Sequence, residues 1–187
     1  MLIGCGMGTD EDTKAVTKFV IENSEVPVVI DADGINCLKG NVDIIDNAKA
    51  PIILTPHPKE MSRITGVPVE KIQENRRDMV KEFTKAHNCI LVLKGASTLV
   101  GSSAYDDMYV NSSGNAGMAT GGSGDVLSGI IASFVSQGVD SFRSAVAGVY
   151  IHGMAGDDVT EKYSMMGNTP SLILKELPTT LGKIEKV

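Results

Sequence analysis

The sequence has no tryptophan, only three cysteines, no long apolar run and no excess of basic residues. Cys5, Cys37 and Cys89 are odd in number, widely spaced and flanked by apolar or small residues, which favours buried reduced thiols over disulfides or metal ligands. No apolar segment reaches the ~20 residues of a membrane span. The net charge of -6 argues against a nucleic-acid surface, which would carry a basic stripe.

The start of the chain, Met1-Leu2-Ile3-Gly4, has no basic segment and no signal-peptide cleavage site. We therefore expect a cytoplasmic protein that binds neither membrane nor nucleic acid. The 187 residues fit one domain with a substantial core, and no repeat or linker divides them. An acidic chain can still hold phosphate through backbone N–H groups, a single lysine or a metal ion.

Three continuous apolar runs, residues 26–30, 51–54 and 89–93, predict strands that are covered on both faces of a sheet. Each run ends in polar residues, and in open parallel sheets this carboxyl edge is where ligands bind. Residues 98–110 predict two further short strands joined by the turn-rich Ser102-Ser103-Ala104.

Helical patterns separate the strands. They cover residues 10–24, 69–87, 124–137 and 140–162, and another helix begins at Thr169-Pro170, which suit the N-cap and the first helical position. Alternating strands and helices predict an α/β fold with a mainly parallel sheet. In the helix over 69–87, Arg76-Arg77 is expected to lie on the solvated face.

The strongest functional signal is the glycine-rich segment from Asn115 to Gly129, and above all Thr120-Gly121-Gly122-Ser123-Gly124-Asp125 before an apolar helix. The first N–H groups of a helix lack intrahelical partners and, with the helix dipole, favour an anion. Asp125, in the first turn, could accept a proton from a substrate hydroxyl as that oxygen attacks phosphorus. The alternative is a flexible turn in which Asp125 only stabilises the helix start.

Other motifs are weaker. The P-loop order Gly-x-x-x-x-Gly-Lys-Ser/Thr is absent, and Gly4-Cys5-Gly6-Met7-Gly8 has the wrong spacing for a dinucleotide fingerprint, so it could be a plain turn. The Pro-bracketed His57 could aim its imidazole at the crevice or belong to a rigid turn. Lys94, at a strand end, could pair with phosphate or be solvated.

Two acidic residues at a strand end, Asp31 and Asp33, could position magnesium through water or cap a helix that begins near Gly34. In either case Asn36 could hydrogen-bond nearby loops. His152 is expected to pack within a helix rather than to take part in catalysis.

Together these motifs resemble the ribokinase-like superfamily and, within it, the ADP/ATP-dependent NAD(P)H-hydrate dehydratases. The Asn115 to Gly129 block is nearly the family's own pattern. Further segments are similar to family motifs and follow in the family's order: Gly4 to Gly8, Ile30 to Asn36, Thr55 to Glu60, Leu93 to Thr98 and Tyr150 to Asp157. The resemblance covers Gly4 to about Asp158, and Lys59 stands where the family's His-Pro-Gly-Glu motif has glycine.

The resemblance implies a three-layer α/β/α ribokinase-like domain over residues 1–187 with a mainly parallel central sheet, lacking the N-terminal part of the family's domain. It implies that Gly6, His57 and Asp125 contact the hydrated nicotinamide dinucleotide, with Asp125 as the catalytic base. ADP or ATP, with Mg²⁺, would lie on two segments, Lys94-Gly95-Ala96-Ser97-Thr98 and Asn115-Ala116-Gly117-Met118-Ala119-Thr120-Gly121-Gly122-Ser123-Gly124. The metal ligands stay open, and a homotetramer is expected.

The implied reaction is the nucleotide-dependent dehydration of hydrated NADH or NADPH, known as NADHX and NADPHX. Because the chain begins almost at the Gly4 turn, we expect a fragment, an unusual start site or a missing part supplied by another chain. Two other hypotheses stay open. One is a kinase of the same superfamily that acts on a vitamin precursor or sugar alcohol, and the other is a non-catalytic nucleotide-binding remnant.

Overall fold

Six strands form one sheet in this computed structural model, which describes residues 1–105 and 107–185. The strands follow one another in chain order: β1 Leu2–Ile3, β2 Val28–Ile30, β3 Ile52–Leu54, β4 Ile90–Leu93, β5 Leu99–Ser102 and β6 Tyr109–Val110. The first four strands are parallel, whereas β5 and β6 each run antiparallel to the strand before. The mainly parallel sheet is therefore confirmed.

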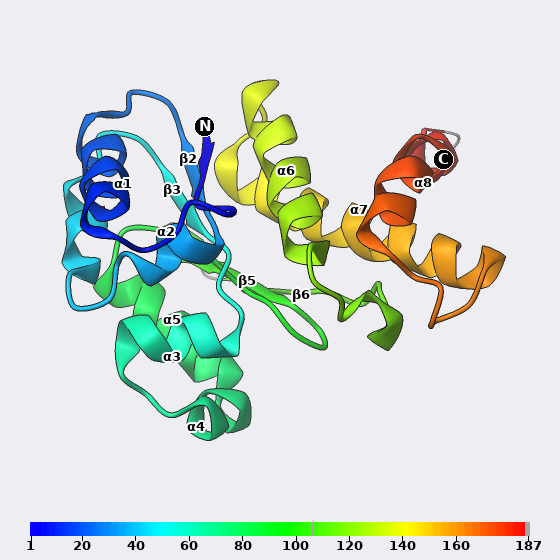
Figure 1. The fold of residues 1–187 in the computed structure, drawn as a ribbon, viewed down its shortest axis with the longest axis horizontal. Helices are drawn as coiled ribbons and strands as arrows, with labels where there is room; N and C mark the ends of the chain where they lie inside the picture. The colour runs from blue at the N-terminus through cyan, green and yellow to red at the C-terminus, as the bar shows by residue number, and fades with distance from the viewer. Residues whose placement is uncertain (106, 186–187) are drawn as a thin grey trace.

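Helices cover both faces of this sheet. They are α1 Glu11–Asn23, α2 Ala32–Asn36, α3 Pro58–Thr65, α4 Val69–Glu74, α5 Arg76–Ala86, α6 Ser123–Ser136, α7 Ser141–Lys162 and α8 Pro170–Ile184, with 3-10 turns η1 Val42–Asn47 and η2 Ala116–Met118. The helices α1 to α5 lie on one side of the strands, α6 and α7 lie on the other, and α8 packs beyond α7 (Figure 1). This is the expected three-layer arrangement.

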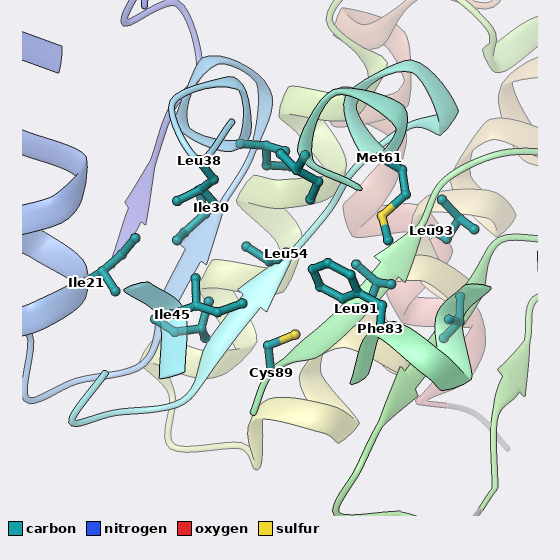
Figure 2. Packing of buried hydrophobic residues seen from close by; sticks show 14 of the residues in the cluster. Ile21, Ile30, Leu38, Ile45, Leu54, Met61, Phe83, Cys89, Leu91 and Leu93 are labelled. Atoms are coloured by element: carbon teal, nitrogen blue, oxygen red, sulfur yellow. The ribbon is translucent and has the colours of Figure 1, made fainter. Parts of the chain in front are cut away.

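The core is divided by the sheet because side chains alternate along a strand. In β2, Val28 and Ile30 pack into one cluster, while Val29 packs into the cluster beneath α6 and α7. In the first cluster, Ile21 from α1 and Met61 from α3 reach the strand residues (Figure 2). Burying each such side chain contributes roughly 1.5–3 kcal/mol, so both faces of the short strands help to stabilise the fold.

Helix α1 is confirmed, but its apolar residues do not all face the core. Val16 and Phe19 are 49% and 66% exposed, while Thr13, Thr17 and Ile21 are buried. The Thr13 hydroxyl donates to the carbonyl oxygen of Met7, which turns this polar face of α1 toward the segment that precedes the helix. The helix therefore exposes two large apolar side chains that its pattern alone would place inside.

The helix predicted over residues 69–87 is interrupted. Asn75 has φ -128 and ψ 43, so the chain leaves the helical conformation between α4 and α5. Of the apolar residues that form the helical pattern over 69–87, Ile72, Val80 and Phe83 are buried, and Met79 is partly buried. The break matters because it sets the direction of Arg76, the first residue of α5.

The later helices begin where the sequence indicates. Thr169 is the N-cap of α8, where its side chain accepts a hydrogen bond from the backbone N–H of Leu172, and Pro170 follows in the first turn. Asp140 caps α7 in the same way through the N–H of Arg143. Among the described residues, no helix is both long enough and apolar enough to cross a membrane.

Candidate functional site

A cavity of about 910 Å³ lies at the carboxyl edge of the sheet, beside the start of α6. Segments that are far apart in sequence line it together. They are the ends of β2, β3 and β4, the loop before α6, the first turn of α6 and part of α7. Of the site residues expected from the sequence, all except Gly6 and Gly117 are among those that line this cavity.

The start of α6 leaves backbone donors free at this cavity. Gly122 is the N-cap in a left-handed conformation with φ 89, which favours glycine, and no side chain caps the helix. The backbone N–H groups of Gly124 and Asp125 have no acceptor within the described part of the chain. This helix start is therefore suited to hold an anion such as phosphate.

Asp125 is exposed at the cavity, in the first turn of α6. Ligand atoms of Asp125, Asp31 and Cys5 lie within 4.8 Å of one another. The carboxylate is thus accessible to a substrate hydroxyl and close to the end of β2. Cys5 is partly exposed here rather than buried as expected, although all three cysteines are free thiols.

Lys94 follows β4 and is ion-paired rather than solvated. Its Nζ lies 2.8 Å from Oδ1 of Asp31 and 3.7 Å from Oε2 of Glu60. The side chain of Asp31 is 1% exposed and that of Lys94 is 17% exposed, so the pair is largely shielded from water. A Cβ on Gly124 would lie 3.2 Å from the Lys94 Nζ, which shows how closely the ammonium passes the start of α6.

Capping by Asp31 is confirmed, although α2 begins at Ala32 and includes Asp33, while a role in positioning magnesium stays a prediction. Asp31 is the N-cap of α2, and its Oδ1 accepts a hydrogen bond from the N–H of Ala32. Asp33 accepts from the N–H of Gly8 and from the amide of Asn36. Asn36 in turn accepts from Arg63, so it hydrogen-bonds a neighbouring element as expected.

The turn from Gly4 to Gly8 supports the end of β2. A Cβ on Gly4, whose φ is 115, would lie 1.9 Å from the carbonyl oxygen of Asp31. Glycine is therefore required for this close approach. Gly6 also has a positive φ, 67, but no atom lies within 4 Å of the position of a Cβ there. The turn brings Cys5 to the cavity edge, whereas Gly6 stays outside the cavity lining.

His57 lines the cavity from the N-cap of α3. Its Nδ1 accepts hydrogen bonds from the N–H groups of Lys59 and Glu60, so the ring proton belongs on Nε2, 3.3 Å from Oε1 of Glu60. Burial lowers the pKa of His57, and the charges of Lys94 and Arg63 lower it further. The imidazole is thus neutral at physiological pH and held in one orientation.

Glu60 completes this arrangement, and sequence reasoning gave it no role. Its carboxylate accepts a hydrogen bond from the N–H of His57, which closes a capping box, and it also faces Lys94. Burial raises the pKa of Glu60, while the charge of Lys94 opposes the shift. The signal was present, because Glu60 stands three residues after the N-cap, where a capping box places glutamate.

The loop from Lys94 to Thr98 is held from behind by Arg76. The guanidinium donates to the carbonyl oxygens of Leu93 at 2.9 Å, Lys94 at 3.4 Å and Ala96. The expectation of a solvated Arg76 is therefore wrong, while Arg77 is exposed as expected. The sequence did not show this because the break at Asn75 turns Arg76 toward β4.

The glycine-rich loop before α6 is fixed to α7. Asp157 accepts hydrogen bonds from the N–H of Gly114 at 2.8 Å and from the amide of Asn115 at 2.8 Å. The Asn115 Oδ1 accepts from Gly117 and Thr160. Asp157 therefore positions the loop rather than lining the cavity. The sequence pattern matched this part of α7 but did not show what it does.

His152 also lines the cavity but is buried, 8% exposed, and its Nε2 lies 3.4 Å from the hydroxyl of Ser123. Burial lowers its pKa to about 4. A neutral, buried imidazole that extends from α7 to Ser123 of α6 supports the expected packing role.

Comparison with known proteins covers almost the whole chain. The family model described as NAD(P)H-hydrate dehydratase matches residues 1–179. The chain is 42% identical over 163 residues to the ADP-dependent (S)-NAD(P)H-hydrate dehydratase of Neisseria meningitidis, covering 86% of this chain and 55% of that protein. It is 37% identical to the bifunctional NAD(P)H-hydrate repair enzyme of Moorella thermoacetica, covering 100% of this chain and 35% of that protein.

Among solved structures, the chain is similar to the ADP/ATP-dependent NAD(P)H-hydrate dehydratase of Bacillus subtilis, which was co-crystallized with ATP/Mg²⁺. The TM-score is 0.89 at 30% identity, over 97% of this chain and 65% of that one. The match confirms the expected ribokinase-like fold. The chain thus spans between about one third and two thirds of the length of these relatives.

Proposed function

The chain belongs to the NAD(P)H-hydrate dehydratase family, and from that membership we propose that it uses ADP or ATP to dehydrate the hydrated nicotinamide ring of NADHX or NADPHX. One observation carries the proposal. An exposed carboxylate, Asp125, lies in the same helix turn as free backbone N–H groups, and Lys94 passes close to this turn at the same cavity. The same turn thus offers an acceptor for a hydroxyl proton and donors for a phosphoryl group.

In the proposed reaction, Asp125 takes the proton of the ring 6-hydroxyl as that oxygen attacks the terminal phosphorus of the nucleotide. The bond from this phosphorus to the bridging oxygen breaks, which leaves AMP from ADP or ADP from ATP. The N–H groups at the start of α6 stabilise the negative charge on the transferring group. Positioning and electrostatics supply most of the catalysis in such transfers.

Elimination follows phosphoryl transfer. The ring nitrogen's electron pair expels phosphate from carbon 6, and the neighbouring ring carbon loses a proton, which restores the reduced nicotinamide. Phosphate leaves far more readily than hydroxide, so the nucleotide drives the dehydration. We assign the dinucleotide to Gly6, His57 and Asp125, and the adenine nucleotide to the Lys94–Thr98 and Asn115–Gly124 segments.

Magnesium fits part of the residue set at this cavity. Asp31 and Asp125 offer carboxylate oxygens, the ligands that Mg²⁺ prefers together with nucleotide phosphates, whereas the Cys5 thiol does not suit this ion. These two carboxylates would hold the ion, and its charge would offset that of the phosphates. Lys94 is already paired with Asp31, so its charge mainly offsets that of this carboxylate.

The test is incubation of the protein with ADP, Mg²⁺ and NADHX while absorbance in the reduced nicotinamide band is followed. We expect the band to recover, and we expect Asp125→Asn to slow the recovery about 100-fold or more while ADP still binds. Phosphorylation of a vitamin precursor or sugar alcohol without recovery would favour the kinase hypothesis. ADP binding without any turnover, unchanged in Asp125→Asn, would indicate the non-catalytic remnant.

We also propose that the protein works in the cytoplasm as a homotetramer, which the family resemblance supports. Sedimentation of the purified chain would show a tetramer if this is correct. A monomer at micromolar concentration would contradict it.

A further inference from the structure

Arg76 is a half-buried cation directly behind the Lys94–Thr98 loop. Its Nη2 donates to the carbonyl oxygens of Leu93 and Lys94, and its Nη1 donates to that of Ala96. A planar guanidinium that binds several carbonyl groups at once fixes a loop more firmly than a flexible ammonium group does. The contact therefore determines the path of the chain where β4 ends and the loop begins.

This loop has two residues with positive φ, and one of them needs external support. Gly95 has φ 145, and Ser97, which is not glycine, has φ 51. A non-glycine residue in the left-handed region is strained and persists only where its surroundings hold it. A Cβ on Gly95 would lie 3.1 Å from the Nη2 of Arg76, so the guanidinium packs against the rear of the loop. Gly95 and Ser97 themselves line the cavity.

The charge of Arg76 is not cancelled by any acid. Within residues 1–105 and 107–185, its guanidinium forms no ion pair with a carboxylate, and its buried Nε has no hydrogen-bond acceptor. The cavity itself has little free positive charge, because Lys94 already faces Asp31 and Glu60. An anionic nucleotide would therefore find in Arg76 a nearby positive charge that is still available, and partial burial limits its screening by solvent.

We propose that Arg76 is a positioning residue for the nucleotide, holding the Lys94–Thr98 loop in its binding conformation and contributing an uncompensated positive charge behind it. The inference rests on the proposed function only for the identity of the ligand, adenine nucleotide. Arg77 provides a matched control, because it is the same residue type at the next position of α5 and its side chain is exposed.

The experiment is calorimetric titration of ADP with Mg²⁺ into the full chain and into Arg76→Met, Arg76→Lys and Arg77→Met. We expect Arg76→Met to weaken ADP binding by roughly tenfold or more, the scale for losing a charged hydrogen-bond donor. Arg76→Lys should recover part of the affinity because the charge remains. Arg77→Met should bind ADP as the unaltered protein does.

Steady-state kinetics distinguishes positioning from a general structural role. Positioning requires that Arg76→Met raises KM for ADP while KM for NADHX stays unchanged, and equal changes in both would overturn the proposal. Equal ADP affinity in Arg76→Met and Arg77→Met would also overturn it. If Arg76→Met does not fold, the ADP affinities of Arg76→Gln and Arg76→Lys test the proposal instead. Arg76→Gln must then bind ADP more weakly than Arg76→Lys.

The binding titration requires no turnover, so the two proposals can fail separately. A protein that binds ADP through Arg76 but does not restore reduced nicotinamide would contradict only the proposed reaction. A protein that restores it with the same ADP affinity in all variants would contradict only the role of Arg76.

Discussion

At the scale of single residues, Lys94 supplies the positive charge that faces two buried carboxylates in the cavity wall. It lies between Asp31 and Glu60, whose side chains are 1% and 6% exposed. A carboxylate removed from water is costly unless it is paired. Lys94 therefore has two roles, since it stabilises two buried acids and also places an ammonium group beside the start of α6.

We expect Lys94→Met to lower the free energy of unfolding by about 3 kcal/mol, because it leaves buried carboxylates without a counter-ion. Urea denaturation monitored by circular dichroism measures this loss. Lys81→Met, at an exposed lysine, should change stability by less than about 0.5 kcal/mol. Addition of Asp31→Asn to Lys94→Met should restore part of the stability. A Lys94→Met protein as stable as Lys81→Met would contradict this account.

His152 makes stability depend on pH. Its pKa is about 4 in the folded protein, against 6.5 when unperturbed, because burial disfavours the charged ring. Between these values the unfolded chain binds the proton more readily. The contribution of the neutral ring is therefore fully present above about pH 6.5 and is lost as pH falls through about 4.

Over that range the loss attributable to His152 should be on the order of 3 kcal/mol. Urea denaturation at a series of pH values, compared between the unaltered protein and His152→Gln, isolates it. The raised pKa of Glu60 acts in the opposite direction, but both proteins share it. Parallel stability curves for the two proteins between pH 6.5 and 4 would show that His152 does not titrate this way.

At the scale of elements, the start of α6 shows how one helix serves both packing and binding. Leu127 and Ile131 anchor the helix against the sheet, while Gly122 and Gly124 leave its first turn open. Gly124 and Gly129 are two glycines of the same helix in different surroundings. A Cβ on Gly124 would approach Lys94 and Asp31, whereas nothing lies within 4 Å of one on Gly129.

We expect Gly129→Ala to stabilise the protein by about 0.5–1 kcal/mol, because alanine favours the helix more than glycine does. Gly124→Ala should gain less stability and should weaken ADP binding several-fold, since its methyl group displaces the Lys94 ammonium. Thermal unfolding and ADP titration of both variants measure the two effects. Equal ADP affinity in the two variants would refute the role assigned to Gly124.

The elements also show where local sequence patterns suffice. The buried strands β2, β3 and β4 were predictable because both faces of a central strand demand apolar residues. The orientation of α1 was not, because Thr13 is held inward by a hydrogen bond to Met7, outside the helix. The break at Asn75 could not be predicted from the apolar pattern either. It leaves the apolar periodicity of α4 and α5 intact while changing the direction of Arg76.

At the scale of the whole molecule, two parts of the chain form the cavity: the part that contains strands β1 to β4, and the part from the loop before α6 to α7. Asp31 and Lys94 come from strand ends, while Asp125 and His152 come from helices on the other side of the sheet. Neither part of the chain forms the cavity alone. A ligand that binds here contacts both, so it should stabilise the complete fold rather than one element.

We therefore expect ADP with Mg²⁺ to raise the free energy of unfolding by about 2.7 kcal/mol at roughly 100 times its dissociation constant. Thermal unfolding followed with increasing ADP gives this increase. Asp125→Asn should keep most of this stabilisation, because the free N–H groups and the Asp31 carboxylate remain in place. Stabilisation by Mg²⁺ alone, with no further effect of ADP, would contradict nucleotide binding at this cavity.

Three features follow from local sequence: the α/β order of elements, the strand ends that carry Asp31 and Lys94, and the glycine-rich start of α6. Each of these depends on neighbours in the chain, through side-chain alternation, helix periodicity and the glycine needed for positive φ. Three others depend on the folded chain: Lys94 is paired with Asp31 and Glu60, Arg76 supports the loop from behind, and Gly6 lies outside the cavity lining. Ion pairs, burial and pKa shifts depend on groups that meet only when the sheet brings separate segments together.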